Sequence, residues 1–135
     1  PAKDLPLQED TILRAMTRFY NLGIHPDWWK LPPLSPKQWS QVDDLIETRD
    51  PYSRGVVMLG LNAPIEQLIV SFEEAQKSRT CRGFAVGRSI FQDPAREWLN
   101  GQIDDAALIQ RCCDSFEQLI LAWQRIRSHS AASAH

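Results

Sequence analysis

The residue best suited to chemistry is Lys30, which stands among bulky apolar side chains in Trp28-Trp29-Lys30-Leu31. This composition predicts a short buried strand, and burial of an ammonium favours the neutral, nucleophilic amine. Such an amine can attack a ketone and form a Schiff base. The alternative is a lysine that extends its charged head to water from the end of a strand and has no catalytic role.

A second candidate group follows the apolar run at 55–59. Gly60, Leu61 and Asn62 form a turn, and Ala63-Pro64 then begins a helical pattern. A glycine lets backbone N–H groups approach a phosphate, and the positive end of the following helix would point at the same place. The alternative is that Gly60 merely permits the turn.

A third candidate group, Gly87 and Arg88, closes the apolar run that begins at Gly83. A guanidinium can donate two parallel hydrogen bonds to phosphate oxygens, so Arg88 could complete an anion site. The alternative is a surface ion pair between Arg88 and either Asp93 or Glu97.

The elements that would position these residues alternate between helix and strand. The predicted order is a helix at 10–22, a strand at 24–31, a helix at 35–48, a strand at 55–60, a helix from 62, a strand at 83–87, a short helix at 94–99 and a long helix from 104 or 105. Such alternation predicts an α/β fold with parallel strands, whose carboxyl ends meet at one edge. The pattern leaves open whether the strands form a small three-layer sandwich or part of a barrel.

Length and charge limit the function classes. A chain of 135 residues is one domain's worth of sequence and is shorter than the roughly 250 residues of a complete eightfold barrel. The net charge of −2 and the absence of a basic run favour neither nucleic acid nor an anionic membrane as a partner. With no apolar signal core or membrane-length run, we expect a soluble, cytoplasmic protein.

The chain is predicted to contain one folded region. Residues 1–9 are expected to form a flexible lead-in, residues 10–127 the folded region and residues 128–135 a disordered tail. The three cysteines lack the spacing of metal ligands, so no metal site is predicted.

Four motifs, at residues 20–31, 49–52, 59–64 and 83–91, resemble the C-terminal portion of a bacterial aldolase-like domain. That domain is often fused behind the sugar kinase of inositol catabolism, 5-dehydro-2-deoxygluconokinase. The resemblance covers about residues 10–127. More distantly, the pattern is similar to class I tagatose-bisphosphate aldolases.

The resemblance implies a partial (β/α)8 barrel in which this chain supplies the parallel strands six to eight and their flanking helices. Lys30 would be the Schiff-base lysine. The loop after strand seven and the end of strand eight would hold the phosphate, through Gly60, Leu61, Asn62, Gly87 and Arg88. The implied substrate is a phosphorylated keto-sugar, 2-deoxy-5-keto-gluconate 6-phosphate, cleaved to dihydroxyacetone phosphate and malonate semialdehyde without a cofactor.

Incomplete closure of such a barrel implies a further partner. The face carrying Trp28, Met58 and Phe84 is expected to lack opposing strands. Either a preceding barrel segment or a second copy of the chain should therefore cover it. A second copy would make the protein a homo-oligomer. A rival hypothesis is a non-catalytic half-barrel that acts as a phosphosugar-binding or assembly module. Pro32, which stands where the relatives have an acidic residue, favours this rival.

Overall fold

The structure is a computed structural model that describes residues 8–132, and this part of the chain contains three parallel strands and five helices. Chain order gives α1 (Thr11–Asn21), β1 (Trp28–Leu31), α2 (Pro36–Arg49), β2 (Gly55–Leu59), α3 (Ile65–Ala75), β3 (Cys81–Ala85), α4 (Arg88–Leu99) and α5 (Asp105–Ala132). The predicted mixed α/β fold with parallel strands is therefore confirmed. None of these helices is both long and apolar enough to cross a bilayer.

Short polar side chains define two helix starts that the sequence predicted. At α2, Gln38 N donates to Ser35 Oγ (3.3 Å) and Ser35 N donates to Gln38 Oε1 (2.9 Å), which forms a capping box. At α5, Ala107 N donates to Asp104 Oδ1 (2.8 Å). Both caps satisfy N–H groups that have no acceptor within the helix.

Two helix boundaries differ from the prediction. α4 begins at Arg88, and Pro94, the predicted start, lies buried inside the helix. Because proline lacks an N–H group, it is unfavourable there, but packing of α4 against α5 outweighs this local preference. α5 continues to Ala132, beyond Arg127, where a tail was predicted to begin. Residues 1–7 of the lead-in predicted at 1–9, and the last three residues of the chain, lie outside the described part.

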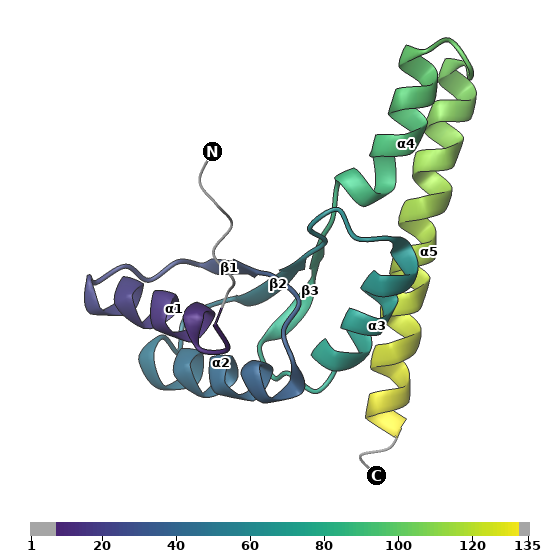
Figure 1. The fold of residues 1–135 in the computed structure, drawn as a ribbon. Coiled ribbons are helices and arrows are strands. Elements are labelled where there is room, and N and C mark those ends of the chain that lie inside the picture. The colour runs from purple at the N-terminus through teal and green to yellow at the C-terminus, as the bar shows by residue number, and fades with distance from the viewer. Residues whose placement is uncertain (1–7, 133–135) are drawn as a thin grey trace.

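The strands lie in the order β1-β2-β3, and all pairs are parallel. Lys30 pairs with Val57, which pairs in turn with Gly83, so these three residues form one row across the sheet. Helices α1, α2 and α3 lie on one side of the sheet, as Figure 1 shows, and α5 packs against α3. Beyond the sheet, α4 and α5 form a projecting hairpin (Figure 1).

The helix-covered face of the sheet contains the core. Trp29 and Leu31 of β1 pair with Val56 and Met58 of β2, and all four side chains are buried. Phe84 pairs with Met58 and packs against Phe72, Phe116 and Trp123. The prediction that Met58 and Phe84 share a face with Trp28 is therefore wrong.

The opposite face of the sheet carries Trp28, Lys30, Val57, Leu59, Gly83 and Ala85, and within residues 8–132 no helix covers it (Figure 1). We call it the open face. Trp28 is 43% exposed there, while its neighbour Trp29 is 8% exposed on the covered face. This alternation agrees with the prediction that Trp28 and Lys30 share one side of their strand.

A bulge interrupts the pairing of β2 with β3. Val56 pairs with Cys81 and Val57 with Gly83, so Arg82 is an extra residue on β3. A bulge of this kind places two consecutive residues on the same side of a strand. Arg82 and Gly83 therefore both lie on the open face.

Candidate functional site

A pocket of about 290 Å³ lies at the carboxyl ends of β2 and β3. It is lined by all five residues that the sequence predicted for phosphate binding, namely Gly60, Leu61, Asn62, Gly87 and Arg88, together with Leu59, Ala85, Val86, Ser89 and Phe91. Two segments separated by some 25 residues of sequence thus meet in one cavity. We call this cavity the strand-end pocket.

The β2 side of the strand-end pocket is a tight turn. Ala63 N donates to Gly60 O (2.9 Å), and the two central residues have positive φ angles, 49° at Leu61 and 62° at Asn62. These are the features of a type I′ turn, in which asparagine is favoured and leucine is unusual. Leu61 therefore stores backbone strain at the rim of the pocket.

Close packing favours glycine directly after β2. A β-carbon added at Gly60 would lie 3.0 Å from Val86 Cγ1, which is tighter than ordinary van der Waals contact. Gly60 therefore brings the turn against the residues that follow β3. This close approach holds the two sides of the strand-end pocket together.

The β3 side of the strand-end pocket is the first turn of α4. Ile90 N and Phe91 N both donate to Gly87 O, at 2.8 and 3.2 Å. Within the described residues, Arg88 N and Ser89 N have no acceptor, as expected at a helix start. Such N–H groups, with the positive end of the helix dipole, favour an anion.

Ser89 adds a polar group that the sequence analysis did not assign to the site. Its Oγ atom is buried and has no hydrogen-bond partner among the residues described, and the residue lines the strand-end pocket. A buried hydroxyl without a partner is costly unless a ligand or water satisfies it. Ser89 follows Gly87 by two residues at a predicted strand end, and this position could have assigned it to the site from the sequence.

The helix that contributes to the pocket is not the one predicted. The sequence placed the positive end of the helix after Asn62 at the site, but α3 begins only at Ile65 and none of its residues lines the pocket. Glu66 also lies in the first turn of α3 and complements its dipole. The helix start at the strand-end pocket belongs to α4.

The charge of the strand-end pocket is positive. Arg88 is exposed, and the two carboxylates considered as its partners pair elsewhere: Asp93 with Arg96 (2.6 Å) and Glu97 with Arg111. None of the ten lining residues is acidic. The guanidinium and the helix start therefore face a pocket with no competing negative charge.

Lys30 lies on the open face, two rows below Leu59 and Ala85, which line the strand-end pocket. It is exposed, so the predicted burial of its ammonium group is wrong, because no described element covers that face. Strand geometry places Lys30 Cα about 8 Å from Leu59 Cα. An extended lysine spans about 6 Å from Cα to Nζ, so the amine can reach the mouth of the pocket.

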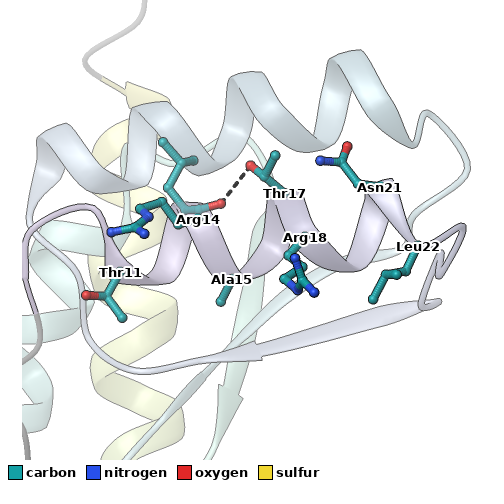
Figure 2. Close-up of a pocket in the computed structure, with 8 residues that line it drawn as sticks. Thr11, Arg14, Ala15, Thr17, Arg18, Asn21 and Leu22 are labelled. Atoms are coloured by element: carbon teal, nitrogen blue, oxygen red, sulfur yellow. Dashed lines mark hydrogen bonds between the residues drawn. The ribbon is translucent and has the colours of Figure 1, made fainter.

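A larger hollow, of about 630 Å³, contains none of the predicted site residues. It runs along α1 and is lined by Thr11, Leu13, Arg14, Ala15, Thr17, Arg18, Asn21 and Leu22. Figure 2 shows that these side chains come from one helix and the residue after it and are spread along its length instead of converging on a point. The polar contact drawn there, from Thr17 Oγ1 to Leu13 O (2.8 Å), is internal to the helix. This surface lacks the convergent polar groups of a ligand site.

Comparison with known proteins gives one family. A family model described as an uncharacterised protein conserved in bacteria (DUF2090) matches residues 1–127. No curated protein and no solved structure is similar enough to the chain to count as a match. Because the match extends over nearly the whole sequence, the chain belongs to this bacterial family, DUF2090.

Proposed function

We propose that this chain is the C-terminal portion of a Schiff-base aldolase that acts on a phosphorylated keto-sugar. Lys30 would attack the ketone and hold it as an iminium, which accepts electrons when the carbon–carbon bond breaks. The strand-end pocket would hold the phosphate. The substrate suggested by the resemblance is 2-deoxy-5-keto-gluconate 6-phosphate, with dihydroxyacetone phosphate and malonate semialdehyde as products.

The observation that carries this proposal is the convergence at the strand-end pocket. Five residues predicted from separate motifs line one cavity with a helix start, an arginine and no acidic side chain. The only lysine of the three strands lies on the adjoining open face within reach of that cavity. An amine and an anion site at this separation suit a ketone that carries a phosphate a few bonds away.

The proposal includes a barrel. Three parallel strands in chain order, with α1, α2 and α3 on one side, are compatible with strands six to eight of a (β/α)8 barrel (Figure 1). A preceding barrel segment or a second copy of the chain would then cover Trp28 and the open face. If a second copy covers this face, light scattering should show a dimer or a larger assembly. A monomer would exclude a second copy as the covering partner.

Reductive trapping tests the role of Lys30. The chain is incubated with dihydroxyacetone phosphate and sodium cyanoborohydride, and the modified lysine is identified by peptide mass mapping. We expect one adduct, on Lys30, that is lost in Lys30→Met and retained in the control Lys77→Met, which removes another exposed lysine. Equal labelling of Lys30, Lys37 and Lys77 would indicate unspecific amine chemistry and contradict the proposal.

The second candidate function is a phosphosugar-binding module without catalysis. The exposure of Lys30 favours it, because the catalytic hypothesis started from a lysine buried among apolar side chains. None of β1, β2 or β3 contains an acidic residue that could move protons near the amine. Binding of dihydroxyacetone phosphate at the strand-end pocket without a trapped adduct would support this module over the aldolase.

A further inference from the structure

The hairpin of α4 and α5 projects past the carboxyl edge of the sheet (Figure 1). α4 packs against α5, and the aromatic contacts of α5 with α3 and β3 are made further along the helix, by Phe116 and Trp123. The outer part of the hairpin is therefore two helices that meet along one seam. Each helix has another side that this seam does not cover.

Both helices carry an apolar stripe beside that seam. The stripes share the spacing i, i+4 and i+7, and they consist of Phe91, Ala95 and Trp98 on α4 and of Ile109, Cys113 and Phe116 on α5. Their large side chains remain in solvent, since Phe91 is 48% exposed, Ile109 63% and Phe116 47%. Leu99, next to Trp98, is 75% exposed. The spacing is typical of a helix face that packs against another helix.

Two contacts across the seam show that the stripes lie on one flank of the hairpin. Trp98 Nε1 donates to Asp105 Oδ1 (2.7 Å), and Arg111 forms an ion pair with Glu97. Because consecutive residues of a helix point about 100° apart, Trp98 and Glu97 mark opposite flanks. Ile109 follows Asp105 by one turn and so lies on the flank of Trp98. We call the surface formed by the two stripes and Leu99 the apolar flank.

None of the residues of the apolar flank is charged. The charged residues interspersed along α4 pair on its other sides, Asp93 with Arg96 (2.6 Å) and Glu97 with Arg111 of α5. A nucleic acid or an acidic peptide would therefore find no complementary group on this surface. An uncharged apolar surface can, however, meet its own copy without repulsion between like charges.

The exposed area of the apolar flank is sufficient for a dimer. If a large apolar side chain presents about 200 Å² when fully exposed, the bulky residues of this surface leave about 500 Å² in solvent at their observed exposures. Pairing of two such surfaces would bury about 1,000 Å², which reaches the lower limit for a specific protein–protein interface.

We propose that two copies of this chain pair through the apolar flank, so that their hairpins form a four-helix bundle about a two-fold axis. A segment that continued the sheet would lie level with β1, β2 and β3, whereas most of the apolar flank lies beyond their carboxyl ends (Figure 1). The second hairpin matches it in length and in chemistry. This contact leaves Trp28 and the open face uncovered, and it does not depend on the proposed function. Phe91 also lines the strand-end pocket, so the interface adjoins that pocket.

Sedimentation equilibrium over a range of micromolar concentrations tests the pairing. We expect a reversible dimer of the unmodified chain, and Ile109→Lys should weaken it about tenfold or more, because burial of an unpaired charge at the contact is costly. Leu121→Lys is the matched control, since Leu121 is a 52% exposed residue of the same helix, about 120° around it from Ile109. This control should leave the dimer unchanged. Circular dichroism should show equal helical content in both variants, because both positions are exposed.

Alkylation of Cys113 gives an independent readout. Because Cys113 is exposed in a single copy, N-ethylmaleimide should modify it more slowly as the protein concentration rises, and Ile109→Lys should remove this protection. A monomer at every concentration, or a dimer whose stability Ile109→Lys does not change, would overturn the inference. A dimer lost in Trp28→Lys but retained in Ile109→Lys would place the second copy on the open face and overturn it as well.

Discussion

Asp43 of α2 accepts a hydrogen bond from the hydroxyl of Ser78, which lies 35 residues later and just before β3, with an oxygen–oxygen distance of 2.7 Å. The same carboxylate also accepts hydrogen bonds from Thr80 Oγ1 (2.5 Å), Thr80 N (3.1 Å) and Arg79 N (2.9 Å). Asp43 is only 1% exposed. A single buried carboxylate thus fixes the position from which β3 starts, and β3 leads to Gly87 and Arg88.

Replacement of Asp43 should therefore be strongly destabilising. Asp43→Ala removes the acceptor of Arg79 N and of the hydroxyls of Ser78 and Thr80, and we expect a loss of about 3 kcal/mol or more in the free energy of unfolding. Urea denaturation measures it. Asp44→Ala is the control, because Asp44 is exposed and forms a surface ion pair with Arg79. This variant should lose less than about 1 kcal/mol in the free energy of unfolding. Similar losses in the two variants would contradict this account.

The strain at Leu61 predicts two substitutions of opposite sign. Leu61→Asn should raise the free energy of unfolding by about 0.5–1 kcal/mol, because asparagine tolerates positive φ. Leu61→Val should lower it by a similar amount, because a β-branched residue does not. Leu61 is 61% exposed, so lost burial contributes little to either result. Thermal unfolding of the two variants checks this, and a shift of the same sign in both would exclude the strain.

Burial raises the pKa of the Cys81 thiol to about 11, from 9.0. Because the folded pKa lies above the unfolded one, the unfolded chain releases this proton first as pH rises. Stability should fall between pH 9 and pH 11, by up to about 3 kcal/mol for two pKa units. Burial also raises the pKa of Tyr20, so Tyr20 contributes to the decrease of stability with pH as well.

Urea denaturation from pH 8 to pH 11 measures that slope. Cys81→Ala should reduce it, and the residual slope should reflect Tyr20. Cys113→Ala, which removes an exposed thiol, is the control and should keep the original slope. An unchanged slope in Cys81→Ala would show that the thiol stays protonated in both states or is not buried.

Arg88 should contribute to phosphate affinity. Arg88→Gln is expected to weaken binding of dihydroxyacetone phosphate about tenfold or more, because it removes a charge-assisted pair of hydrogen bonds. Titration calorimetry at fixed salt is the measurement, since screening changes such affinities. Arg96→Gln removes an arginine of α4 that does not line the strand-end pocket, and its affinity should match that of the unmodified chain. A loss of the same size in Arg96→Gln would point to a nonspecific charge effect.

Local patterns predicted much of this fold. The capping box at Ser35 and Gln38 and the apolar run at 55–59 each depend on neighbours in sequence, and the structure agrees with both. The strand-end pocket followed from topology, because parallel strands bring their carboxyl ends together wherever they lie in the sequence. The residues at Gly60 and Gly87 could thus be grouped before their contacts were known.

Long-range packing decided what the sequence did not reveal. The start of α4 at Arg88 depends on the contact of α4 with α5, which overrides the local signal at Pro94. Exposure of Lys30 depends on which face of the sheet the helices cover, and an isolated apolar strand does not contain that information. Ser89 Oγ is likewise buried at a pocket that two segments distant in sequence form together.

The bulge on β3 also keeps in phase everything that follows it. Without the bulge, Arg82 would pair with Val57 and Phe84 with Leu59, which would turn the ring of Phe84 to the open face, away from Phe72 and Trp123. Every later residue of the strand would change sides in the same way. The bulge therefore accommodates an extra polar residue on one surface of the sheet while the aromatic core on the other surface keeps its register.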